Sequence, residues 1–230
     1  MPFEFIESKI LFVEGIDEIN TISALMKERE KWSVRYNSAD DLEYEKDAHK
    51  YCVIHKSKEQ AIQIVALGGK EKFNSDLPDI KKISGFKELI NSIGIILDAD
   101  SNYNATYESA SNTLKSCGLP SSSNHSEFTN SNPRIGIFII PAKDKVGMLE
   151  SLCLESIAEY PIMQCVNNYI ECAKIKGFTI ADNKIDKSRC QIYLSTHKDL
   201  PNSVGRGAQK KCWNFNHSCF DELCEFIKSI

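Results

Sequence analysis

Three acidic residues stand directly after short apolar runs of the sequence. Glu14 follows residues 10–13, and Asp98 and Asp100 follow residues 93–97. Alternate side chains of an extended segment point the same way, so Asp98 and Asp100 can direct two carboxylates toward one point. Carboxylate oxygens suit Mg²⁺ or Mn²⁺, ions that bridge carboxylates and substrate phosphates. We therefore predict a divalent-metal site to which Glu14 adds a third ligand.

Each part of this pattern also has a plainer interpretation. An Asp-x-Asp pair alone is often a polar turn after a strand. Gly15 permits a tight turn at the strand end, and Asp17 is either a further metal ligand or the N-cap of the next helix, which we favour slightly. The strongest evidence for the predicted site is that two separate strands both end in carboxylates. Folding alone does not require that coincidence.

The surrounding elements predict an α/β fold. Apolar runs bounded by turn residues indicate strands, and helical spacing of apolar residues indicates helices. The predicted strands cover residues 10–13, 51–55, 61–67, 93–97 and 135–140, and the predicted helices cover residues 17–31, 86–90, 105–116 and 146–156. Such alternation indicates a mostly parallel sheet flanked by helices, whose ligands bind at the carboxyl ends of the strands.

The chain divides into a core and a helical extension. We expect residues 1–160 to form the α/β core, with a polar insertion around residues 33–60 that forms a surface excursion. Residues 161–230 are predicted to form a helical, basic C-terminal extension on that core, with helices over residues 161–175, 187–196 and 218–229.

Composition limits the class of protein. The 230 residues include 42% hydrophobic residues and carry a net charge of −4, and no apolar run approaches the roughly 20 residues of a membrane span. The N-terminus lacks a signal peptide, so we expect a cytoplasmic protein without membrane contact. Nine cysteines without a Cys-x-x-Cys pair predict reduced core residues, and zinc binding by Cys212, His217, Cys219 and Cys224 is disfavoured by their spacing.

Basic residues cluster late in the chain. Residues 184–211 hold seven Lys or Arg against two Asp, a net charge of +5 that could face phosphates. The alternative for residues 184–211 is a solvated basic surface. Elsewhere in the chain, Gly68-Gly69-Lys70 is expected to form a simple turn. The predicted phosphate contacts are Lys70, Lys143, Lys145, Lys187, Arg206 and Lys210.

The acidic motifs resemble a known domain. Val13-Glu14-Gly15-x-Asp17 and Asp98-Ala99-Asp100 resemble the toprim domain of topoisomerases, primases and OLD-type nucleases. Gly147-Met148-Leu149-Glu150 and Gly205-Arg206-Gly207-Ala208-x-Lys210 resemble a small stand-alone toprim-like family, over nearly the whole chain. The resemblance implies a toprim-like, Rossmann-like sheet.

The resemblance also implies roles for single residues. It implies that Glu14 acts as a general acid or base or binds the metal, and that Asp98 and Asp100 coordinate the metal. Glu150 becomes a candidate for a second metal ion or its waters, and a solvent-facing helix position is its alternative. One or two ions are expected, and Asp144 and Glu155 rank lower as ligands.

Nuclease is the leading functional hypothesis, because the remainder of the chain is too short for the tyrosine module of a topoisomerase or the extra parts of a primase. The substrate could be DNA or RNA. No Walker-type motif occurs, so an ATPase like that of OLD-type systems, in a defence role, must be a separate subunit. The alternatives are a non-catalytic or partner-dependent nucleic-acid or nucleotide-binding subunit, and a phosphohydrolase for small substrates.

Overall fold

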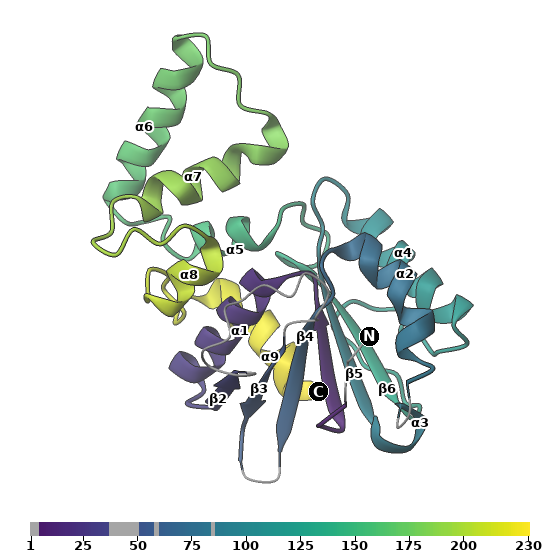
Figure 1. Cartoon of the computed structure of the whole chain (residues 1–230). Coiled ribbons are helices and arrows are strands. Elements are labelled where there is room, and N and C mark those ends of the chain that lie inside the picture. Colours follow the sequence, from purple (N-terminus) through teal and green to yellow (C-terminus); the bar gives the residue numbers. More distant parts are fainter. Residues whose placement is uncertain (1–4, 37–50, 58–59, 84–85) are drawn as a thin grey trace.

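The protein folds around a six-stranded sheet with helices on both faces (Figure 1). The computed structural model describes residues 5–36, 51–57, 60–83 and 86–230 and has the strand order β2-β3-β4-β1-β5-β6. Parallel pairing joins β4, β1, β5 and β6, whereas β2 and β3 form an antiparallel edge. The strands are β1 (Lys9–Val13), β2 (Ser33–Tyr36), β3 (Tyr51–His55), β4 (Ala61–Ala66), β5 (Ser92–Asp98) and β6 (Arg134–Ile140). The predicted α/β class with a mostly parallel sheet is confirmed.

Two hydrophobic cores lie on opposite faces of this sheet. In β1, Leu11 and Val13 point to the face covered by α1 (Ile16–Arg29) and α5 (Leu149–Glu155). The alternate residues Ile10 and Phe12 point to the face covered by α2 (Lys70–Ile80), α3 (Phe86–Leu89) and α4 (Tyr103–Ser116). The chain thus leaves β1 toward one face and the neighbouring β5 toward the other, an arrangement that opens a crevice at their carboxyl ends.

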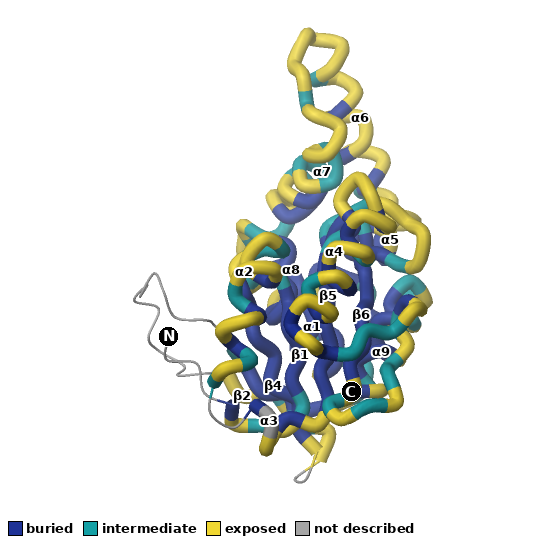
Figure 2. Tube along the Cα trace, turned by 90° about the vertical axis from the view of Figure 1, so that its right-hand side faces the viewer, coloured by how far each residue is buried: buried dark blue, intermediate teal, exposed yellow. Residues whose placement is uncertain are grey.

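The C-terminal region is helical, as predicted. It comprises α6 (Ile162–Ile175), η1 (Asp182–Lys184), α7 (Ile185–Leu194), α8 (Val204–Gln209), η2 (Ser218–Phe220) and α9 (Asp221–Ser229). Trp213 and Phe220 are buried in the same hydrophobic cluster as Leu11 and Val13, so this region shares a core with the sheet. Helices α6 and α7 instead project away from the body (Figure 2). The predicted division at residue 160 stays a prediction.

Three elements differ from the predictions. Gly68-Gly69-Lys70 is not a simple turn, because α2 begins at Lys70 directly after the two glycines, and Pro78 lies within it. The expected surface excursion contains the edge strand β2. Its side chains are mostly exposed, so no apolar run in the sequence marks it as a strand. Residues 37–50 and 58–59 of the predicted insertion lie outside the described residues. The short helix α8 was also not predicted, because its two glycines disfavour a helix.

Membrane and disulfide features can be stated for the described chain. Among these residues, no helix is long and apolar enough to cross a membrane. All nine cysteines are free in the structure, and their reduced state stays a prediction. Cys165 and Cys172 are exposed on α6, whereas most of the others are buried.

The glycines of the Gly205-Arg206-Gly207 motif are explained by close helix packing. A Cβ atom on Gly205 would lie 2.8 Å from Asp17 Cα and 2.9 Å from Asn20 Cβ. A Cβ atom on Gly207 would lie 2.7 Å from Leu194 Cδ2. At Gly205 the backbone of α8 contacts α1 directly and leaves no room for a larger side chain, whereas Gly207 packs against the side chains of Leu194 and Trp213.

We expect Gly205→Ala to destabilise the protein by about 2 kcal/mol, because overpacking of a tight contact typically costs roughly 1–3 kcal/mol. Thermal unfolding should show a decrease in Tm of about 4–8 °C for a chain of this size. Arg206→Ala is the matched control, since Arg206 is exposed and should leave Tm nearly unchanged. Equal Tm values for the two variants would contradict the packing explanation.

Candidate active site at the carboxyl ends of the strands

Glu14 and Asp98 meet at the carboxyl ends of neighbouring strands. Asp98 N donates to Glu14 Oε1 at 2.8 Å, so the first carboxylate lies against the backbone that carries the second. The backbone oxygen of Glu14 accepts hydrogen bonds from Gly68 N at 2.7 Å and Gly69 N at 2.8 Å, which ties the end of β1 to the start of α2. The predicted convergence of the two strand ends is therefore present.

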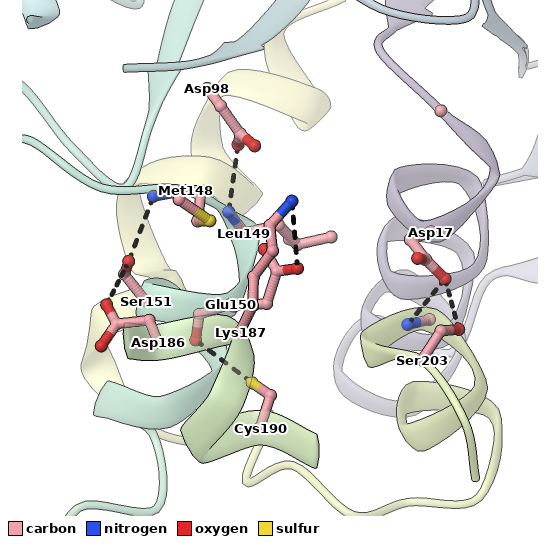
Figure 3. A network of polar contacts seen from close by, with 12 residues as sticks. Asp17, Asp98, Met148, Leu149, Glu150, Ser151, Asp186, Lys187, Cys190 and Ser203 are labelled. Carbon is pink, nitrogen blue, oxygen red and sulfur yellow. Dashed lines mark hydrogen bonds and ion pairs between the residues drawn. The ribbon is translucent and has the colours of Figure 1, made fainter. Parts of the chain in front are cut away.

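The second carboxylate, Asp98, contacts the start of α5 (Figure 3). Leu149 N donates to Asp98 Oδ1 at 3.0 Å and thereby satisfies one of the free amides of the first helical turn. Asp100 and Gly147 exchange backbone hydrogen bonds of 2.7 and 2.8 Å. The loops after β5 and β6 are thus joined, and Glu150 lies in the first turn of α5 beside Asp98.

Burial and mutual repulsion raise the pKa of these carboxyls. Desolvation raises the pKa of Glu14, against the lowering effects of the Asp98 amide and the Lys70 ammonium. The pKa of Asp98 is raised well above its ordinary value, first by burial and then by the charges of Glu18 and Glu14. Burial also raises the pKa of Glu150, although Lys187 opposes it. At this edge of the sheet, burial therefore favours the protonated, neutral forms of these carboxyls.

Glu18 is a site residue that the sequence reasoning missed. It is only 8% exposed, and its Oε2 accepts a hydrogen bond from Gly15 N at 2.8 Å, the reciprocal contact of a capping box. Burial, followed by the charges of Glu14 and Asp17, raises its pKa to about 7. The signal was its position in the first helical turn, four residues after Glu14, where a capping glutamate is common.

Asp17 does not cap α1 as expected. The N-cap is Gly15, and Asp17 lies within the first turn. Its Oδ1 accepts hydrogen bonds from Ser203 Oγ at 2.6 Å and Gly205 N at 3.1 Å, so it stabilises the start of α8 instead (Figure 3). A partner almost 190 residues away in sequence determines this orientation. A metal-binding role of Asp17 stays a prediction.

Two predicted phosphate contacts lie among the carboxylates. Lys70 forms an ion pair with Asp100, and Lys187 Nζ lies 3.8 Å from Glu150 Oε1. Lys143 and Lys145 are exposed in the loop after β6, at the same edge of the sheet, and Lys145 Nζ lies 3.9 Å from Glu155 Oε2.

The other two predicted contacts are on or next to α8. Arg206 contacts Gln209 Oε1 at 3.0 Å, and Lys210 pairs with Asp199 at 3.2 Å. Within the described residues, the polar contacts of these two side chains are with Gln209 and Asp199 and not with the carboxylates at the strand ends.

A cleft of about 370 Å³ opens beside Asp100, between α2 and α4. Its lining includes Ala99, Ala105 and Ala110 and the ion pair of Lys70 and Asp100. The three alanines contribute only methyl groups, which leaves this space free. A substrate group beside Asp100 therefore has room to enter.

The carboxylates fit a divalent cation by chemistry but not by their present arrangement. Their hard oxygen atoms are the donors that Mg²⁺ and Mn²⁺ prefer. Within the described residues, however, no three His, Cys, Asp or Glu side chains are grouped to hold an ion. Asp98 Oδ1 accepts a hydrogen bond from Leu149 N, and Asp100 pairs with Lys70, so each carboxylate already has one partner and keeps a second oxygen that could bind an ion.

The raised pKa of Glu18 predicts a stability that falls with pH. The folded protein retains this proton up to about pH 7, whereas an unfolded glutamate loses it near 4.5, so the native state binds more protons between these values. The free energy of unfolding should therefore decrease across that interval, by on the order of 3 kcal/mol from this group. Glu18→Gln keeps the acceptor for Gly15 N but never ionises. Denaturant unfolding in EDTA should give Glu18→Gln a larger free energy of unfolding than wild type at pH 8, but not at pH 4.5. The same difference in free energy at both pH values would contradict this prediction.

Comparisons with known proteins place the fold and the family. A crystal structure of a hypothetical protein from Pyrococcus horikoshii OT3 is similar, with a TM-score of 0.57 and 16% identity over 98% of this chain and 95% of that chain. At that identity the likeness concerns the fold alone. No curated protein matches the chain. Residues 8–230 match the family DUF3226, described as a protein of unknown function, and the chain therefore belongs to the DUF3226 family.

Proposed function

We propose that this protein is a metal-dependent nuclease of the toprim type, which hydrolyses phosphodiester bonds of DNA or RNA. One observation carries the proposal: Glu14, Glu18, Asp98 and Glu150 gather at adjacent strand and helix ends, and burial, followed by the charges of neighbouring carboxylates, raises their pKa values. Perturbed carboxyls of this kind concentrate at functional sites.

The energetics favour a bound cation. Packing carboxylates together away from water is costly unless a positive charge compensates them. Glu14, Asp98 and Asp100 would hold Mg²⁺ or Mn²⁺, and Glu150 would hold a second ion or its waters. Such an ion polarises the phosphoryl oxygen and lowers the pKa of its bound water.

The protein groups supply the remaining parts of the reaction. Glu14, whose pKa is raised by burial, suits the role of a base that accepts a proton from the attacking water. Lys70, once released from Asp100, can contact a phosphate oxygen at the mouth of the cleft. The cleft between α2 and α4 would receive the sugar or base next to the bond that breaks.

A conditional activity is the second candidate function. The present arrangement favours it, because Leu149 N and Lys70 occupy Asp98 and Asp100 and the described carboxylates do not converge on one point. In this alternative the chain binds nucleic acid and depends on a partner protein for activity. The partner that we propose is a separate ATPase subunit. The two candidates differ in whether the isolated protein cleaves.

We expect the isolated protein to cleave nucleic acid with Mg²⁺ or Mn²⁺ and not in EDTA. Plasmid DNA, single-stranded DNA and RNA are the substrates to compare by gel electrophoresis. Asp98→Asn and Asp100→Ala should lower the rate at least 100-fold, since each removes a proposed ligand. Asp79→Asn, an exposed aspartate on α2, is the matched control and should retain the wild-type rate. Absence of cleavage under every condition would support the partner-dependent alternative.

Metal binding should also be visible without catalysis. At an ion concentration about ten times the Kd, binding to the native state adds about 1.4 kcal/mol, which corresponds to an increase in Tm of about 3–6 °C for a chain of this size. We expect Mn²⁺ to raise the Tm of the wild type and of Asp79→Asn by this amount, but not that of Asp98→Asn. An equal shift in all three proteins would exclude Asp98 as a ligand.

A further inference from the structure

Helices α6 and α7 form an arm, residues 162–194, that projects from the body of the molecule (Figures 1 and 2). Its base is fixed, because Met163, Val166, Cys190, Tyr193 and Leu194 are buried in the core of the α1 face. Its tip is different: residues 171–184 are exposed except for two partly buried positions. The tip therefore extends into solvent with little packing of its own.

The arm carries large apolar side chains that nothing covers within the described residues. Ile175 is 81% and Phe178 is 70% exposed, the two highest values among the exposed large hydrophobic residues of the described chain, and Tyr169 is 62% exposed. Single exposed hydrophobic residues are common, but their concentration on one projecting element indicates an interaction surface. Two of these three side chains are aromatic rings that are free to stack.

The charge of the molecule is divided in a way that favours an anionic partner. Residues 161–211 contain nine Lys or Arg and four Asp or Glu, a net charge of +5, which leaves −9 for the rest of the chain. Lys176, Lys184, Lys198 and Lys211 are exposed and have no ion pair within the part of the chain that the structure describes. The exposed ring of Phe178 lies in sequence between the first two of these lysines.

We infer that the arm binds single-stranded nucleic acid, with unpaired bases stacked on Tyr169 and Phe178 and phosphates paired with Lys176 and Lys184. Exposed rings interleaved with free lysines are the features that bind single strands without sequence preference. A duplex offers no base faces for such stacking. This inference rests on the proposed function, because it assigns the substrate class of the same nuclease.

The arrangement of the apolar groups favours a flexible strand over a docked protein helix. Tyr169 and Ile175 are six residues apart on α6, so their side chains diverge by about 120° around the helix axis. A partner helix requires anchors along one face, whereas a single strand can follow a curved surface. The arm is also joined to the acidic site, since Ser151 Oγ donates to Asp186 Oδ2 at 2.7 Å and Lys187 pairs with Glu150 (Figure 3).

The test is fluorescence anisotropy with a labelled 20-nucleotide single-stranded DNA, the same sequence as RNA, and the DNA duplex, all in EDTA so that no cleavage occurs. We expect wild type to prefer the single strands. Phe178→Ala and Tyr169→Ala should each raise Kd about fivefold or more, and Phe178→Trp should restore binding. Lys176→Glu with Lys184→Glu should weaken binding and reduce the slope of log Kd against log salt by about 1.4.

Matched controls are Leu89→Ala and Lys115→Glu, exposed residues on α3 and α4 outside the arm, which should leave Kd unchanged. Unaltered binding by the two ring variants, or no binding of either single strand by wild type, would overturn the inference. A Phe178→Ala change from dimer to monomer by light scattering, without any effect on oligonucleotide binding, would also overturn it and identify a protein interface. Hydrolysis of bis(4-nitrophenyl) phosphate by wild type and Asp98→Asn tests the proposed chemistry separately.

Discussion

The contact of Asp98 with its neighbours on both sides is the constraint on which this edge of the molecule depends. Its amide binds the carboxylate of Glu14 and its own carboxylate binds the amide of Leu149, so β1, β5 and α5 meet at one residue. Backbone amides can orient a carboxylate, but they carry no net charge that would neutralise a group of them. These contacts therefore fix the geometry without neutralising the carboxyls, and the raised pKa values of Glu18 and Asp98 are the consequence.

This group of carboxyls is hard to explain by stability alone. A neutral residue in place of Glu18 would keep the capping contact to Gly15 without the cost of a buried charge. The lysines at this edge form ion pairs with Asp100 and Glu150, whereas Glu14 and Asp98 have backbone amides as their hydrogen-bond partners. Natural proteins tolerate such unfavourable local arrangements chiefly at functional sites.

Strand ends and the carboxylates they carry were predictable because the apolar runs before Glu14 and Asp98 are continuous. Helix α2 was not, since the two glycines before it and Pro78 within it both indicate a break. Its Phe73 and Leu77 pack in the core on the sheet, a tertiary contact that outweighs these local signals. Asp17 was expected to cap α1 but stabilises the start of α8, because its hydrogen-bond partners are distant in sequence. Local patterns therefore predicted the sheet and part of the site, whereas contacts across the fold determined the remainder.

Helix α5 connects the arm to the acidic edge of the sheet. Glu150, in the first turn of α5, pairs with Lys187 on α7, and Ser151 beside it binds Asp186 of the same helix. Any change in the charge at Glu150 therefore alters the ion pair that joins the base of the arm to the site. Because Leu149 N at the start of α5 also donates to Asp98, this short helix contacts both the strand end at Asp98 and the base of the arm. The sequence places these groups far apart, and α5 is the element that brings the acidic edge and the arm into contact with one another.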